Sequence, residues 1–358
     1  MTRQERALGK LREGTFIPAQ PLALTKDRVI DEERQRLLTR YYLSSGVGGV
    51  AVAVHTTQFE IRDEKYNLLE TVLRLAVEEI EAYEEKTGDV IVRVSGVCGP
   101  IHQAVQEAKL AKRLGYDAVL LSPGGLSHLS EEELLERSRA VAAIIPVIGF
   151  YLQNSVGGRR LSFEYWKQLA DIENVVGVKM APFNRYQTAD VVRGILTSHR
   201  RDEISLYTGN DDNIVIDLLT KYKFLIDGVA YEKDIVGGLL GHWSVWTKTA
   251  VDLFHEIKAA ASLPNIPAEL LTLAAEITDV NGVFFDVAND FKGCIAGLHE
   301  VLRRQGILEG IWCLNEEETM SDGQNEEIDR VYKMYPHLND DEFVKNHLEA
   351  WKHGIVEN

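Results

Sequence analysis

Lys179 ends the apolar run Val175-Val-Gly-Val-Lys179 and is well placed in this chain to attack a carbonyl group. If the run is a buried strand, burial disfavours the ammonium form, lowers the lysine pKa and frees the amine as a nucleophile. A lysine at a strand end can equally extend its ammonium into solvent. The segment alone therefore leaves both interpretations open.

Other polar side chains also follow apolar runs. Tyr151 ends Ile148-Gly-Phe-Tyr151, where a phenol can pass a proton to and from a substrate oxygen. Thr56 and Thr57 follow the run 49–54, and their hydroxyl and N–H groups can hold a carboxylate. Structural roles are also open, since Tyr151 can be a core aromatic and the threonines can be ordinary turn residues.

The segments around these residues follow one repeated pattern, in which a short apolar run is followed by an amphipathic segment. Most runs are continuous rather than alternating, as expected for parallel strands buried on both faces. Eight candidate strands lie at 16–19, 49–54, 90–97, 118–121, 147–151, 175–179, 204–208 and 226–230. Helical segments lie between them, for example 63–84, 130–143 and 162–170. The pattern predicts an α/β fold, a (β/α)8 TIM barrel.

The alternation of short apolar runs and amphipathic segments ends after about residue 233, where long helical patterns follow one another. They cover 243–261, 268–278, 284–304, 322–335 and 340–353, which is more than an eighth barrel helix requires. We therefore expect additional C-terminal helices, with a barrel at 1–240 and a helical region at 241–358 packed on it.

Composition restricts the function classes. The formal net charge of −16 argues against nucleic acid or an anionic membrane as a partner, because both bind clustered Lys and Arg. No apolar run reaches a membrane span, and residues 1–14 contain no apolar signal segment, so we expect a cytoplasmic protein. The chain has no GxGxxG, Walker A, GxSxG or HExxH motif, and three scattered cysteines, so we expect no cofactor and no metal.

The order of these segments resembles the dihydrodipicolinate synthase/N-acetylneuraminate lyase family, whose members show Gly-Thr-Thr-Gly-Glu, Tyr-Asn-x-Pro and x-Gly-x-Lys motifs. From Tyr151 to Lys179 there are 28 positions (179 − 151), which matches the family without an insertion. The matching segments span nearly the whole chain: Gly14-Thr-Phe-Ile-Pro-Ala19, Thr56-Thr57, Tyr151, Val175-Val-Gly-Val-Lys-Met-Ala181, Gly209-Asn-Asp-Asp212 and Lys292-Gly-Cys-Ile-Ala-Gly-Leu.

The resemblance implies a barrel enzyme, usually tetrameric, of the class I aldolase or dehydratase type. By that match, Lys179 forms a Schiff base with a 2-keto acid and Tyr151 relays protons. Thr56 and Thr57 bind the keto acid carboxylate, and Thr57 also passes protons to Tyr151. Because His55 and Ala230 follow or end the second and eighth predicted strands, we expect them to bind substrate as well.

The chain also departs from the family pattern. His55-Thr-Thr-Gln-Phe59 replaces Gly-Thr-Thr-Gly-Glu, which alters a loop where the backbone comes close to the ligand. Synthases carry an arginine where this chain has Val156, and Pro-Tyr-Tyr where it has Pro123-Gly-Gly125. Dihydrodipicolinate synthase activity proper is therefore disfavoured.

The leading hypothesis is a Schiff-base-forming lyase, an aldolase or dehydratase acting on a 2-keto acid or keto sugar acid through Lys179. One alternative is a barrel that binds a small acid without catalysis, or that only oligomerises. Another is a metal-dependent barrel aldolase. We expect a homo-oligomer, a dimer or tetramer, without nucleic-acid or membrane partners.

Overall fold

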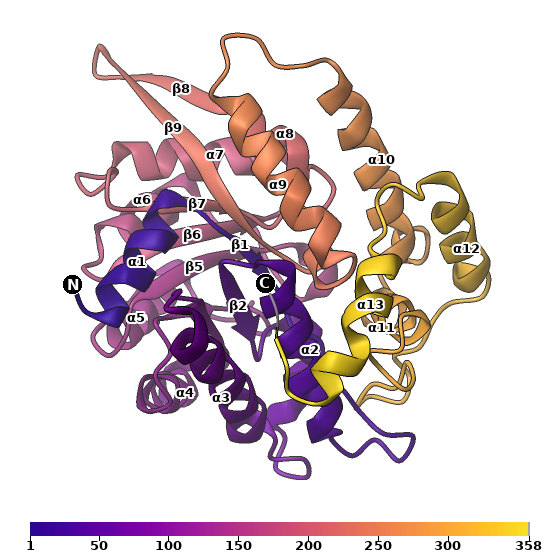
Figure 1. Cartoon of the computed structure of the whole chain (residues 1–358). Helices are drawn as coiled ribbons and strands as arrows, with labels where there is room; N and C mark the ends of the chain where they lie inside the picture. The colour runs from indigo at the N-terminus through magenta and orange to yellow at the C-terminus, as the bar shows by residue number, and fades with distance from the viewer. Residues whose placement is uncertain (357–358) are drawn as a thin grey trace.

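The computed structural model describes residues 1–356, and its centre is a barrel of eight parallel strands (Figure 1). The hydrogen-bonded order is β1-β9-β7-β6-β5-β4-β3-β2, and a bridge between Ala19 and Ala51 brings β1 beside β2. The predicted (β/α)8 barrel is confirmed. Its strands are β1 (Phe16–Pro18), β2 (Gly49–Val52), β3 (Val92–Val97), β4 (Ala118–Leu121), β5 (Val147–Leu152), β6 (Val175–Ala181), β7 (Ser205–Thr208) and the second half of β9 (Val229–Leu240).

The prediction of the eighth strand at 226–230 is wrong. These residues form the tip of a hairpin in which β8 (Lys221–Ile226) pairs antiparallel with the first half of β9. Asp227 and Gly228 turn the chain with positive φ angles of 51° and 80°, the conformation of a two-residue hairpin turn. The barrel part of β9 begins only at Ile235, which pairs with Leu206. Ala230 is exposed on the projecting hairpin, so its predicted place at a substrate site is also wrong.

Helices cover the outside of the barrel. The predicted capping box is present, because the Ser130 hydroxyl accepts the Glu133 N–H at 3.2 Å and the Glu133 carboxylate accepts the Ser130 N–H at 2.7 Å. The helices that follow the barrel strands are α2 (Glu32–Ser45), α3 (Leu69–Thr87), α4 (Ile101–Arg113), α5 (Glu131–Ala142), α6 (Phe163–Asp171), α7 (Arg185–Thr197), α8 (Ile214–Leu219) and α9 (Thr247–Ala261).

Helix α1 (Arg3–Glu13) lies across the amino-terminal end of the barrel. Its Ala7 and Leu11 belong to the cluster of apolar residues that fills the barrel interior. The hydroxyl of Tyr207 on β7 donates to the Leu11 carbonyl at 2.7 Å. The barrel is therefore closed at this end, and a ligand has access only from the opposite end, where the strands have their carboxyl termini.

The C-terminal helices are α10 (Glu269–Phe284), α11 (Cys294–Arg304), α12 (Gln324–Met334) and α13 (Asp341–Lys352). The predicted single helix at 284–304 is wrong, because Asp286, Asp290 and Phe291 have positive φ angles of 54°, 53° and 68° and separate α10 from α11. No helix within residues 1–356 is long and apolar enough to cross a membrane. The domain division at residue 240 stays a prediction.

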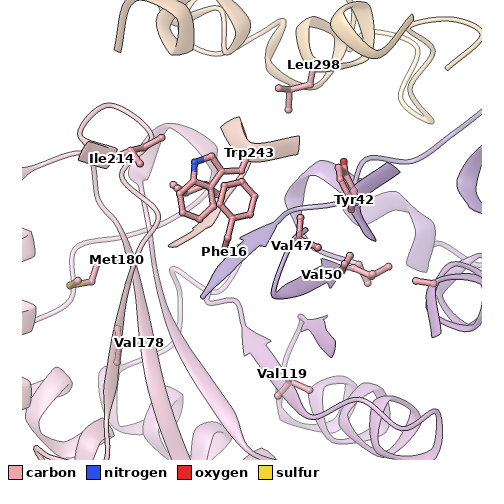
Figure 2. Packing of buried hydrophobic residues seen from close by; sticks show 14 of the residues in the cluster. Phe16, Tyr42, Val47, Val50, Val119, Val178, Met180, Ile214, Trp243 and Leu298 are labelled. Carbon is pink, nitrogen blue, oxygen red and sulfur yellow. The ribbon is translucent and has the colours of Figure 1, made fainter. Parts of the chain in front are cut away.

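Two layers of apolar residues pack against the sheet. One layer fills the barrel, and the other lies between the strands and the surrounding helices. In the outer layer, Phe16 and Trp243 stack with ring centroids 3.8 Å apart, and Val178 and Met180 lie together on β6 (Figure 2). Lys179, between these two residues on the strand, therefore points into the barrel.

Candidate active site

A cavity of about 70 Å³ lies at the carboxyl ends of the barrel strands, and Lys179 is among its lining residues. Most of its lining is apolar and includes four phenylalanines, of which Phe285 and Phe291 come from the C-terminal region. These two side chains, which we call the roof of the cavity, come from the segment that joins the additional helices ending at Phe284 and beginning at Cys294. The polar lining residues are His55, Thr56, Gln153, Lys179, Asp211 and Cys294.

Lys179 is held inside the barrel by its neighbours. Its side chain is 8% exposed, and its Nζ atom lies 4.5 Å from the centroid of the Phe150 ring. Gly209 packs against it so closely that a Cβ atom there would lie 2.4 Å from Lys179 Cε. Burial lowers the pKa of Lys179, and the nearby Asp211 carboxylate offsets part of this effect. A neutral amine is therefore more accessible here than on a surface lysine.

Phe150, and not Tyr151, lies opposite Lys179. Val147 on β5 pairs with Val175 on β6, but the next pair is Ile148 with Gly177, so the register shifts by one residue. Phe150 consequently pairs with Lys179. Because a one-residue slip exchanges the two faces of a strand, the matching spacing of 28 positions does not place Tyr151 inside the barrel.

Tyr151 faces the outer helices instead. Its ring packs against Trp166 of α6 with centroids 5.0 Å apart, and its hydroxyl accepts the Leu161 N–H at 3.4 Å. Tyr151 does not line the cavity that contains Lys179. The expectation that this phenol relays protons at Lys179 is wrong, because strand β5 presents its even-numbered residues to the barrel interior.

The two threonines join the second strand loop to the end of β1. The Thr56 hydroxyl donates to the Ala19 carbonyl at 2.8 Å, and the Thr57 hydroxyl donates to the Gln20 carbonyl at 2.7 Å. Thr56 lines the cavity, whereas Thr57 is fully buried behind it. The structure does not support the expected proton transfer from Thr57 to Tyr151, since neither the Thr57 side chain nor the Tyr151 side chain lines the cavity.

His55 and Gln58, which replace glycines of the family pattern, change the loop that follows β2. His55 lines the cavity, and burial, together with the nearby Lys179, lowers its pKa to about 4, so its ring is neutral at pH 7. Gln58 keeps a positive φ of 68° at a position where the family has glycine. Its side chain accepts the Leu314 N–H at 2.6 Å and so connects the loop to the C-terminal region.

Asp211 lies in the Gly209-Asn-Asp-Asp212 segment that resembles the family, but it was not among the predicted catalytic or binding residues. It is 5% exposed, lines the cavity with Lys179, and accepts the His242 N–H at 2.8 Å. Burial raises its pKa, and nearby Lys179 offsets part of the increase. Its position after the seventh strand was a usable signal. Phe285, Phe291 and Cys294 had no such signal, because they reach the cavity from the C-terminal region.

The two positions where the family pattern has an arginine and a tyrosine are occupied here by Val156 and Gly125. Val156 lines the cavity, and Arg159 instead donates to the backbone carbonyl groups of Ser127 and Leu129. Within residues 1–356, no arginine lines the cavity. A Cβ atom on Gly125 would have no neighbour within 4 Å. The cavity therefore offers no guanidinium group to a carboxylate within residues 1–356.

The fold and the cavity define a (β/α)8 barrel protein with a buried lysine at the carboxyl ends of its strands. Residues 15–221 match the dihydrodipicolinate synthetase family, and the chain belongs to this family. It is 25% identical over 165 residues to a 4-hydroxy-tetrahydrodipicolinate synthase of Nitratidesulfovibrio vulgaris, covering 46% of this chain and 54% of the relative. It is 26% identical over 167 residues to an N-acetylneuraminate lyase of Mediterraneibacter gnavus, covering 46% and 50%.

The chain thus spans about half the length of the curated relatives it matches. Solved structures share the fold over more of the chain. Dihydrodipicolinate synthase from Oceanobacillus iheyensis superimposes with a TM-score of 0.72 and 14% identity, covering 94% of this chain and 99% of the other. N-acetylneuraminate lyase from Fusobacterium nucleatum complexed with pyruvate gives 0.68 and 17%, covering 90% and 97%.

Proposed function

We propose that this protein is a lyase of the class I aldolase type in which Lys179 forms an imine with a 2-keto acid. One observation carries the proposal: the Lys179 amine lies in a mostly apolar cavity at the carboxyl ends of the barrel strands, where burial lowers its pKa. Membership of the dihydrodipicolinate synthetase family supports it. The iminium ion formed from the amine accepts electrons when a bond at the adjacent carbon breaks. Aldol cleavage and dehydration share this intermediate.

A small substrate with an apolar tail suits the cavity best. A volume of about 70 Å³ gives room for a short 2-keto acid, since one water needs ~10–15 Å³ on the same measure. His55, Thr56 and Gln153 are the proposed binding groups for its polar end. Val156 and the phenylalanines would contact its apolar end.

Reduction with borohydride in the presence of pyruvate and a panel of 2-keto sugar acids tests the proposal. Mass spectrometry should find the reduced adduct on the peptide that contains Lys179. Lys179→Ala and Lys179→Arg should remove the adduct and any turnover, since neither side chain provides a nucleophilic amine. An adduct of unchanged yield in either variant would contradict the role of Lys179.

The main alternative is a barrel that binds a small acid without catalysis. The outward orientation of Tyr151 favours it, because the expected proton relay is missing. It predicts that calorimetry detects binding of a keto acid while borohydride traps no imine. Among the described residues, no group of three or more His, Cys, Asp or Glu side chains is placed to hold a metal ion. A homo-oligomeric state and a cytoplasmic location stay predictions.

A further inference from the structure

An imine-forming lysine needs a partner that moves protons. The carbonyl oxygen of the substrate must leave as water, and a hydroxyl or carbon must lose or gain a proton when the adjacent bond breaks or forms. Phe150, which lies over the Lys179 amine, has no ionisable group. The Tyr151 hydroxyl lies outside the cavity, and the Thr57 hydroxyl donates to a backbone carbonyl. The proton-transfer group must therefore come from another element.

We infer that Asp211 is the proton acceptor and donor of the reaction at Lys179, in the role expected of a tyrosine; the inference rests on the proposed function. Asp211 lines the same cavity as Lys179 and is 5% exposed. Strand β7 brings it there, because Tyr207 pairs with Lys179 and the Gly209 N–H then donates to the Met180 carbonyl at 2.7 Å.

The loop that carries Asp211 is fixed by its neighbour Asp217. The Asp217 carboxylate accepts the Thr208 hydroxyl at 2.7 Å and the side-chain N–H groups of Asn210 and Asn213 at 2.8 and 2.7 Å. The turn is therefore held from both sides of Asp211. These three bonds hold the turn around Asp211 and do not involve the Asp211 carboxylate.

One carboxylate oxygen of Asp211 is fixed and the other is available. Oδ1 accepts the His242 N–H at 2.8 Å, whereas no side chain within residues 1–356 forms a hydrogen bond to Oδ2. Lys179 and Asp211 form no ion pair within residues 1–356; the ion pairs of this region join Arg185 to Asp212 and Asp217. A substrate carbon bonded to the lysine can thus lie between the amine and Oδ2.

The surroundings of Asp211 let it both accept and donate a proton. Burial raises its pKa toward neutrality, although the nearby Lys179 opposes the shift. An ordinary aspartate would be ionised at pH 7 and would be a poor proton donor. The other ionisable side chains around it are Lys179 on β6, Asp212 on its own loop, His55 on the second strand loop, His242 after β9 and Cys294 on α11.

Each proton in the proposed sequence is accounted for. The Lys179 ammonium first gives one proton to the Asp211 carboxylate. The free amine then adds to the keto carbon and one amine proton moves to the oxygen, which gives the carbinolamine while Asp211 stays protonated. Protonated Asp211 then gives its proton to the hydroxyl, which leaves as water, and the iminium forms. The carboxylate next removes a proton from the substrate hydroxyl, the carbon–carbon bond breaks, and its electron pair forms the enamine as the aldehyde leaves. Asp211 returns this proton to the enamine carbon, and water then hydrolyses the iminium to release Lys179.

Exchange of the methyl protons of pyruvate in D₂O, followed by NMR, tests this role without knowledge of the natural substrate. The exchange requires the imine and then a base that removes a C3 proton. Asp211→Asn keeps the size of the side chain and an oxygen for the His242 N–H, so the fold should be retained, which thermal unfolding checks. We expect exchange to fall by ~10²–10⁴-fold.

Two control variants separate this role from the alternatives. Tyr151→Phe and Asp212→Asn should exchange within a few-fold of the unchanged protein, because neither side chain lines the cavity. The exchange rate of the unchanged protein should rise with pH as Asp211 ionises in the pyruvate imine, whereas Asp211→Asn should lose this dependence.

The outcomes also separate this inference from the proposed function. If borohydride traps an imine and Asp211→Asn exchanges at the unchanged rate, Asp211 has no such role, although the imine chemistry stands. A large loss in Tyr151→Phe instead would return the role to the tyrosine. If no member of the keto acid panel is trapped at Lys179, both the inference and the proposed function fail.

Discussion

At the amino-terminal end of the barrel the buried charges are paired, whereas at the carboxyl end the buried Lys179 and Asp211 are not. Arg3 of α1 lies 2.8 Å from Glu84 and 2.5 Å from Asp117, and Arg93 at the start of β3 lies 2.6 Å from Glu84. This network connects the closing helix to the strands. Its charges have their partners within the fold.

The opposite end holds an amine and a carboxylate of similar burial but without such partners. Desolvation therefore lowers the pKa of Lys179 and raises that of Asp211. At the other end, the ion pairs outweigh desolvation for Arg3 and Glu84, so that the pKa of Arg3 is raised and that of Glu84 is lowered. Perturbed, unpaired groups in a cavity are typical of functional sites. The comparison separates charges that stabilise the barrel from charges available for chemistry, and substitutions at each end test this separation.

Removal of a paired charge at the amino-terminal end should have the largest effect. Arg93 is 3% exposed and contacts both Glu81 and Glu84. Arg93→Ala should lower the free energy of unfolding by about 1.5–3 kcal/mol, because the half-buried Glu84 loses one of its two arginine partners. Urea denaturation measures the loss.

Arg139→Ala is the matched control for Arg93→Ala. Arg139 pairs with Glu132 on the surface, with the two side chains 47% and 61% exposed. Its removal should cost about 1 kcal/mol or less. Similar losses in the two variants would show that the network at the amino-terminal end has no special part in stability.

At the carboxyl end, the addition of one methyl group at Gly209 should mainly slow imine formation at Lys179. A Cβ atom at Gly209 would lie 2.4 Å from Lys179 Cε and 3.0 Å from Ala181 Cβ, so Gly209→Ala must displace the lysine. A displacement of about 1 Å can cost ~10²-fold in rate, and we expect such a loss in the rate of borohydride trapping with pyruvate.

Gly282→Ala controls for the effect of an added methyl group. A Cβ atom on Gly282 in α10 would have no neighbour within 4 Å, and alanine favours the helix by roughly 0.5–1 kcal/mol. Its trapping rate should be unchanged. An unchanged rate in Gly209→Ala as well would mean that the position of Lys179 adapts, and the cavity would then be less rigid than its packing indicates.

The barrel could be predicted from the sequence because each strand is marked by a pattern of neighbouring residues. Seven of the eight strands are short apolar runs, and Lys179 ends one of them. The eighth strand was misplaced because the apolar residues beside Asp227-Gly228 belong to a hairpin arm, and the turn signal should have been preferred. In both cases the deciding information lies within about ten residues.

Two features of the site could not be derived in this way. The orientation of Tyr151 depends on an extra residue in β6 between Val175 and Gly177, and a continuous apolar run does not reveal which residue is extra. The roof formed by Phe285 and Phe291 depends on contacts between segments far apart in the chain. Register and long-range packing are set by the whole fold, so local periodicity does not report them.

The smallest expected effect is a gain in stability at the carboxyl end, opposite in sign to that of Arg93→Ala. Lys179→Met removes a desolvated amine and keeps an unbranched apolar side chain of similar length. The free energy of unfolding at pH 7 should stay equal or rise by roughly 0.5–2 kcal/mol, with loss of the borohydride adduct. Asp211 is then held neutral by its burial.

The pH dependence of this gain identifies its cause. Because the pKa of Lys179 is lowered in the fold, the unfolded chain binds more protons between that value and ~10.4, and the stability of the unchanged protein rises with pH in this range. The advantage of Lys179→Met should therefore be largest near neutral pH and decrease toward pH ~10. Urea denaturation at several pH values measures it, with Lys333→Met on the exposed side of α12 as the control. A clear loss of stability in Lys179→Met would instead assign this lysine to the paired, structural charges, as at the other end of the barrel.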